Sequence, residues 1–253
     1  MLENKVCIVT GAASGIGLAI AESFAKDGAR VVMADINEDK LKVEAERIGG
    51  LYFKTDLSKR ADCKGLVDYA IEKYSKVDIL INVAGIQTVS PIEEFPEDKW
   101  DFMINLMLTA PFLLTKYVWP SMKEQKWGRI INLNSIHGLV ASEFKSAYVS
   151  AKHGLSGLTK TAALEGGEFG ITVNSICPAY VRTPLVDNQI EAQAATHGIS
   201  KEEVVEKIML KNSAVKKLIE PSMVADYAKF LCSEAGQFIS GATLTMDGGW
   251  TAR

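Results

Sequence analysis

The chain has 253 residues, of which 47% are apolar, and carries a formal net charge of -3 with an isoelectric point near 5.7. This length and apolar content suffice for a substantial core, and because no linker divides the chain we expect one domain over residues 1–253. The acidic balance lacks the clustered Lys and Arg that a phosphate backbone requires, which argues against nucleic-acid binding.

Residues 1–5 lead directly into the first apolar run, without a charged segment followed by a long apolar stretch, so the sequence predicts a cytoplasmic protein that does not associate with a membrane. The cysteines lack CxxC spacing and suit buried thiols in a reducing compartment. They are Cys7, Cys63, Cys177 and Cys232. We expect neither a disulfide nor a metal site.

Short apolar runs with strand character alternate with longer segments of helical period. The predicted strands cover residues 6–10, 31–35, 51–55, 79–82, 129–134, 172–177 and 243–246. The predicted helices cover residues 16–27, 39–48, 59–74, 99–124, 147–168 and 222–234. This alternation predicts an α/β fold in which a doubly wound, seven-stranded parallel sheet has helices on both faces.

Residues 184–217 carry two further helical patterns, at 185–195 and 201–209, but no strand. The segment precedes the last crossover of the predicted sheet. An insertion of this kind is expected to form a helical lid over a site.

The first chemical motif follows the first strand. Gly11, Gly15 and Gly17 open a helix there, so that backbone N–H groups and the positive helix end can meet a pyrophosphate. The spacing TGxxxGxG differs from the commoner GxGxxG fingerprint. A turn that only caps the helix is the alternative interpretation.

Acidic and small residues follow the next strands. Asp35 ends the second strand, where a carboxylate can accept hydrogen bonds from ribose hydroxyls and repel a 2′-phosphate, which predicts NAD rather than NADP. A cap for the following helix is the competing role. Asp56 and Leu57 are expected at the adenine edge, although such residues often only form a turn. In the segment 82–85, Ala84 and Gly85 let backbone approach the ribose.

Tyr148 and Lys152 lie four residues apart in a predicted helix, which places them on one face. A free phenol has a pKa of about 10, and a fixed ammonium nearby lowers that pKa, so we expect Tyr148 to act as a general base or acid. Ser135 lies upstream and can donate to the same substrate oxygen. A Tyr and a Lys at this spacing are often a surface pair, but the glycine loop and Ser135 favour catalysis.

These motifs resemble the short-chain dehydrogenase/reductase family over essentially the whole chain. The resemblance rests on TGAASGIG at 10–17, Asp35, NVAG at 82–85, Asn105, Ser135, YVSAK at 148–152 and Pro178. It implies a Rossmann fold, a homotetramer and a catalytic tetrad of Asn105, Ser135, Tyr148 and Lys152. In this family Asn105 anchors a water that links Lys152 to solvent. Val83 departs from the family pattern, which usually has a second Asn there, and we expect altered hydrogen bonding near the cofactor.

The resemblance also implies a set of cofactor-binding residues. They are Gly11, Ser14, Ile16, Gly17, Asp35, Asp56, Leu57, Asn82, Ala84, Gly85, Tyr148, Lys152, Pro178, Val181 and Thr183. The implied cofactor is NAD.

Further stretches, at 85–96, 127–132, 135–141, 145–148 and 246–251, resemble a bacterial branch of the family that oxidises (R)-3-hydroxybutyrate to acetoacetate. That resemblance implies that the substrate carboxylate is bound by Gln87, His137, Lys145 and Gln189, beside Ser135 and Tyr148. Amide donors and a cation suit a small anion, because hydrogen bonds to charged groups contribute about 1.5–3 kcal/mol each. As single residues they could equally be solvated, or in the case of His137 packed beside the catalytic loop. Tyr180 stands where that branch typically has Trp, which leaves the preferred chain length open.

Two other functions stay open at this point. Another family member, acting on a 3-oxoacyl thioester, a sugar or a steroid, would keep the tetrad but ignore a free carboxylate. An NAD-binding regulatory protein without turnover would not need all four groups. The helices at 99–124 and 147–168 are candidates for an interface between subunits.

Overall fold

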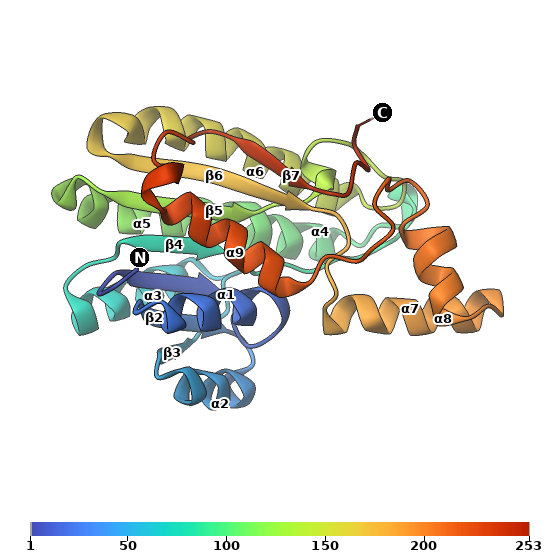
Figure 1. The fold of residues 1–253 in the computed structure, drawn as a ribbon, viewed down its shortest axis with the longest axis horizontal. Coiled ribbons are helices and arrows are strands. Elements are labelled where there is room, and N and C mark those ends of the chain that lie inside the picture. Colours follow the sequence, from blue (N-terminus) through green and yellow to red (C-terminus); the bar gives the residue numbers. More distant parts are fainter. Residues whose placement is uncertain (1, 253) are drawn as a thin grey trace.

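Seven parallel strands form the centre of the molecule, in the order β3-β2-β1-β4-β5-β6-β7 (Figure 1). The computed structural model describes residues 2–252. The strands are β1 (Val6–Thr10), β2 (Arg30–Asp35), β3 (Leu51–Lys54), β4 (Ile79–Asn82), β5 (Gly128–Leu133), β6 (Ile171–Pro178) and β7 (Thr243–Met246). Because the order reverses between β1 and β4, the connections that follow these two paired strands run to opposite faces of the sheet and leave a crevice for a ligand.

Helices cover both faces of the sheet (Figure 1). One face carries α1 (Gly15–Lys26), α2 (Glu38–Ile48) and α9 (Pro221–Cys232), and the other carries α3 (Arg60–Tyr74), α5 (Ala110–Gln125) and α6 (Ser146–Gly166). The remaining helices are α4 (Glu97–Ile104), α7 (Pro184–His197) and α8 (Lys201–Glu203). The predicted fold class, a doubly wound seven-stranded α/β sheet, is therefore confirmed.

The strands could be predicted from apolar runs in the sequence because they are buried. All five residues of β1 are buried, and neighbouring side chains alternate between the two cores: Ile8 packs on the α3/α5 side, Cys7 and Val9 on the α1/α9 side. The predicted bounds of β1, β4 and β7 agree with the structure, and the other strands differ at their ends, where boundaries are least defined. All four cysteines are buried free thiols.

The predicted helix 99–124 is continuous but not uniformly α-helical. It runs from α4 through a π-helical turn, Asn105–Thr109, into α5. Pro111 has no N–H to donate to the Met107 carbonyl, and the turn before it widens so that the Ala110 N–H bonds to the Asn105 carbonyl. The proline thereby places Asn105 at a local break in the helix.

Among residues 2–252, this stretch, Glu97–Gln125, is the one helix long and apolar enough by composition to cross a membrane. Its apolar side chains Leu114, Val118 and Met122 are buried in the core between the sheet, α3 and α6. The apolar composition is thus accounted for by packing inside the α/β sandwich.

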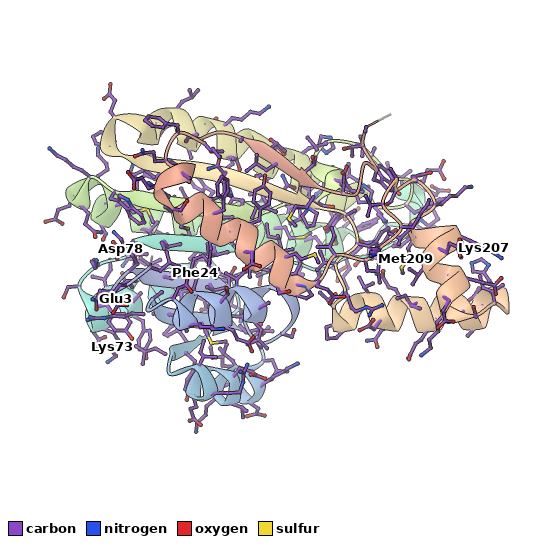
Figure 2. The ribbon with its side chains drawn as sticks, viewed as in Figure 1. Glu3, Phe24, Lys73, Asp78, Lys207 and Met209 are labelled. Carbon is purple, nitrogen blue, oxygen red and sulfur yellow. The ribbon has the colours of Figure 1, made fainter. Side chains whose placement is uncertain are left out.

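The segment after β6 forms a small helical unit beyond the strand ends. It contains α7, α8 and a π-helical stretch, Val204–Met209, where the sequence predicted two simple helices. Its own apolar cluster joins Val186, Ile190, Val204 and Met209 and is separate from the two cores of the sheet. Figure 2 shows Met209 on the inner side of this unit and Lys207 on its outer side.

Candidate active site

A cleft of about 350 Å³ opens at the carboxyl ends of the central strands. It lies where the strand order reverses, the place expected for a dinucleotide in a doubly wound sheet. The predicted site residues that line it are Gly11, Ser14, Ile16, Gly17, Asp35, Ala84, Gly85, Gln87, Ser135, His137, Lys145, Tyr148, Lys152, Pro178, Val181, Thr183 and Gln189. The structure thus brings most of the predicted cofactor residues and all four predicted carboxylate residues to one cleft.

The glycine positions of the loop leave little or no room for a side chain. Gly11 and Gly15 have φ of +62° and +56°, a left-handed backbone that favours glycine. A Cβ on Gly17 would lie 2.2 Å from the Gly11 carbonyl oxygen. Ser14, the N-cap of α1, makes no side-chain capping bond within the described chain, so its hydroxyl stays available beside the helix N-terminus. This tight backbone cradle fits a pyrophosphate.

The turn after β4 packs directly on the glycine loop. Thr10 Oγ1 accepts the N–H groups of Val83 at 2.9 Å and Ala84 at 3.2 Å. A Cβ on Gly11 would approach the Ala84 Cα to 3.0 Å. The departure at Val83 therefore leaves the turn intact, because the turn is held through backbone N–H groups.

Asp35 connects the glycine loop to the end of β2. Its carboxylate accepts the Ala13 N–H at 3.1 Å and the Asn37 N–H at 3.0 Å, and it lines the cleft. The N-cap of α2 is Asn37, whose side chain accepts the Lys40 N–H. Asp35 is therefore not the helix cap, and each of its two oxygens accepts one backbone N–H at the edge of the cleft.

Three predicted cofactor residues lie outside the cleft lining. Asp56 accepts hydrogen bonds from the Ser58 backbone and hydroxyl, and that hydroxyl is the main cause that lowers the pKa of its carboxyl. Leu57 is buried in the core, and the Asn82 amide donates to Asn132 Oδ1 at 2.8 Å. Contact of these residues with a cofactor stays a prediction.

The predicted acid–base pair lies on the first turns of α6, facing the end of β5. Lys152 is buried, and its Nζ donates to the Leu133 carbonyl at 2.7 Å while lying 5.6 Å from the centroid of the Tyr148 ring. Ser135 follows β5, and its Oγ accepts the His137 N–H. Asn105, the remaining member of the predicted tetrad, lies on the π-helical turn and outside the cleft lining.

The electrostatics of Tyr148 differ from the expectation. Burial raises the pKa of the phenol, and the hydrogen bond with Ser135 opposes that rise. Burial also lowers the pKa of the Lys152 ammonium to about 8. Lys152 is not among the groups that set the pKa of Tyr148 in the chain by itself, and its ammonium donates to the Leu133 carbonyl. The effect of Lys152 on the phenol therefore stays a prediction.

A polar cluster lies beside Tyr148 in the cleft. Lys145 Nζ lies 3.3 Å from His137 Nε2, and burial together with the Lys145 charge lowers the pKa of His137 to about 4. Burial also lowers the pKa of Lys145, and no carboxylate among the described residues offsets that effect. Gln87 and Gln189 line the same cleft. A desolvated cation without an acidic partner, flanked by amides and a neutral imidazole, favours an anionic ligand.

Some residues in and beside the cleft were not predicted from the sequence. Trp250, which is outside the cleft lining, packs edge-on against His137 with ring centroids 6.3 Å apart, while Tyr148 packs on the same imidazole at 6.1 Å. Ile86 and Val186 add apolar lining. The sequence feature that could have pointed to Trp250 is the Asp-Gly-Gly turn before it, because a fixed turn next to an aromatic residue indicates an oriented side chain.

The glycine cradle, the strand-end carboxylate and the Ser-Tyr-Lys arrangement define a family. The family described as short chain dehydrogenase matches residues 5–194, and the chain belongs to it. It is accordingly an oxidoreductase with a Rossmann-type fold for a nicotinamide dinucleotide.

Individual proteins show which members of the family this chain is similar to. The chain is 45% identical to D-beta-hydroxybutyrate dehydrogenase of Rhizobium meliloti, over 99% of this chain and 100% of that protein. It is 44% identical over 258 residues to a protein of the same name from Cupriavidus necator. The solved structure of levodione reductase superimposes with a TM-score of 0.92 at 28% identity, covering 100% of this chain and 99% of that one.

Proposed function

We propose that this protein oxidises (R)-3-hydroxybutyrate to acetoacetate with NAD, and catalyses the reverse reduction. One observation carries the proposal: the Lys145 ammonium, desolvated and without an acidic partner, lies in the same cleft as Tyr148 and Ser135. A small acid with a secondary hydroxyl would place its carboxylate at Lys145 and its hydroxyl group at Tyr148 and Ser135. The names of the two dehydrogenase relatives support this choice of substrate.

The cofactor proposed is NAD rather than NADP. The Asp35 carboxylate would accept hydrogen bonds from the adenine ribose and repel a 2′-phosphate. Gly11, Ser14 and Gly17 would meet the pyrophosphate, with Val181 and Thr183 also lining the cleft. When bound, the oxidised nicotinamide supplies the acceptor for the hydride from carbon 3 of the substrate.

The chain's own residues hold the acid and move its proton. Lys145, His137, Gln87 and Gln189 would bind the carboxylate and thereby fix the position of the hydroxyl group. Tyr148 would then remove the hydroxyl proton.

Ser135 would donate a hydrogen bond to the same substrate oxygen as its charge develops. Lys152 would stabilise the phenolate as the proton leaves, with Asn105 in the relay to solvent that the family resemblance implies.

The helical unit at residues 184–217 is proposed as the lid of this single domain. Its base, Thr183, lies against the glycine loop, since a Cβ on Gly15 would be 3.2 Å from the Thr183 methyl group. Gln189 and Val186 of α7 line the cleft, so closure would bring both toward the substrate and exclude water. A homotetramer is proposed on the family resemblance.

The test is NADH formation with (R)-3-hydroxybutyrate, its (S)-enantiomer and its methyl ester, with NAD and NADP compared in parallel. The proposal expects NAD-dependent turnover of the (R)-acid only. Turnover of the ester or of another alcohol, but not of the acid, would keep the dehydrogenase and overturn the substrate. NADH binding without turnover of any of these compounds would instead favour a binding protein.

A further inference from the structure

Three polar side chains form a buried row across the sheet, just below the cleft. Asn82 of β4 pairs in register with Asn132 of β5, which pairs in register with Ser175 of β6. Their exposed fractions are 5%, 0% and 0%. Polar side chains so deep in a parallel sheet need hydrogen-bond partners, since an unpaired buried polar group is costly.

Thr159 of α6 supplies those partners from the helical layer. Its Oγ1 lies 2.9 Å from Asn132 Nδ2, 2.8 Å from Ser175 Oγ and 2.8 Å from the Leu155 carbonyl. Because a hydroxyl has one proton and Leu155 can only accept, Thr159 donates to Leu155 and accepts from both Asn132 and Ser175. This fully fixed hydroxyl holds α6 to two neighbouring strands.

The position of Thr159 links this row to the acid–base pair. It lies seven residues after Lys152 and eleven after Tyr148, so all three project from one side of α6. On the strand side, Asn132 directly precedes Leu133, whose carbonyl accepts from Lys152. Two successive residues of β5 are thus tied to two residues of α6 that lie two helical turns apart.

We propose that Thr159 and Asn132 are positioning residues for catalysis. Their hydrogen bond fixes the position of α6 along the direction of β5, and thereby fixes where Tyr148 and Lys152 lie relative to Ser135. Apolar packing alone is non-directional, whereas a buried hydrogen bond has one allowed separation and angle. Asn82 extends the row to β4, whose end carries the turn at Val83 and Ala84. The inference rests on the proposed role of Tyr148 as acid and base, but not on the choice of substrate.

The experiment compares three variants of the full chain. Thr159→Val keeps the shape of the side chain and removes the hydroxyl, and Thr159→Ser restores the hydroxyl. Thr115→Val, on α5, removes a hydroxyl of similar burial outside the row and serves as the matched control. The readouts are kcat, KM and the pH profile of oxidation, the affinity for NADH by fluorescence, and amide hydrogen exchange of residues 148–156.

For Thr159→Val we expect kcat to fall roughly ten-fold or more while KM and the NADH dissociation constant stay within about two-fold. The pH profile should shift and exchange at 148–156 should rise, whereas Thr159→Ser and Thr115→Val should match the wild type in all these respects. If Thr159→Val does not fold, Thr159→Ala, which also removes the hydroxyl that accepts from Asn132 but leaves space beside that amide, should shift the same readouts in the same direction.

Unchanged exchange and an unchanged pH profile in Thr159→Val, or the same losses in Thr115→Val, would overturn the inference. Wild-type inactivity toward (R)-3-hydroxybutyrate would contradict the proposed substrate instead. In that case the exchange of residues 148–156 still decides whether Thr159 positions the acid–base pair, so the two failures are distinguishable.

Discussion

The two halves of the cleft are built in different ways. The cofactor half consists mainly of backbone: the glycine loop, the turn at Ala84 and the carboxylate of Asp35 are held by hydrogen bonds and by contacts that leave no space for a Cβ. The substrate half consists of side chains from separate segments, and it places the Lys145 ammonium 3.3 Å from His137 without an acidic partner. The first half is preformed by steric fit, whereas the second carries an uncompensated charge that an anionic ligand would offset.

The largest effect is expected where the two halves meet. Tyr148→Phe removes the proton acceptor, so we expect turnover to fall by about 10²–10⁴-fold with NADH affinity nearly unchanged. Steady-state rates and NADH fluorescence measure the two quantities, and Tyr117→Phe on α5 is the control. If Tyr148→Phe retained most of the wild-type rate, the phenol would have no acid–base role.

The next largest effect is expected from a steric change in the cofactor half. In Gly17→Ala the new methyl group would overlap the Gly11 carbonyl oxygen, 2.2 Å away. Overpacking of this kind costs about 1–3 kcal/mol, so we expect NADH affinity to fall roughly ten-fold or more. Gly157→Ala, on α6 with open space around the added Cβ, is the matched control and should leave NADH affinity unchanged. Equal NADH affinities in the two variants would contradict a steric cradle.

We expect charge in the cofactor half to set the choice of dinucleotide. Asp35→Ser would remove the proposed hydrogen bonds to the ribose and the repulsion of a 2′-phosphate, so kcat/KM should fall roughly ten-fold with NAD and rise with NADP. Rates with both dinucleotides measure the ratio, and Asp39→Ser in the first turn of α2 controls for loss of an acidic group. A preference for NAD that survives Asp35→Ser would assign the selectivity to other residues.

The last effect concerns the stability of the fold rather than activity, and it arises in the substrate half. The pKa of His137 is about 4 in the folded chain, against 6.5 for a free imidazole. As the pH falls from 6.5 to 4, the unfolded chain takes up a proton that the folded chain excludes, and the free energy of unfolding decreases by up to about 3 kcal/mol.

His137→Gln should lack this part of the decrease, while His153→Gln on the exposed side of α6 should retain it. Urea unfolding at pH 7 and pH 4.5 measures the difference. Parallel pH dependence in wild type and His137→Gln would show that the imidazole is not held neutral by its surroundings.

Much of the architecture could be predicted from local pattern. Strands β1 and β4 are buried on both faces and bounded by turns, so their apolar runs show in the sequence. The glycine loop was equally readable, because its residue types follow from backbone geometry. From the sequence alone, Asp35 could either bind the cofactor or cap the following helix. Only the structure shows that Asn37 caps α2.

Features that depend on distant residues could not be predicted. The direction of the Tyr148 pKa follows from desolvation, which spacing along a helix does not reveal. The contact of Trp250 with His137 joins segments far apart in the chain. The π-helical turn arises from a missing N–H at Pro111 that a periodic pattern does not record.

The most direct measurement is kcat/KM of the wild type and of Lys145→Met on (R)-3-hydroxybutyrate and on its methyl ester. Loss of one charge-assisted hydrogen bond, about 1.5–3 kcal/mol, should lower kcat/KM for the acid by roughly ten-fold or more and leave the ester unchanged. Equal losses for acid and ester, or no loss for the acid, would contradict a carboxylate site at Lys145 and with it the proposed substrate class.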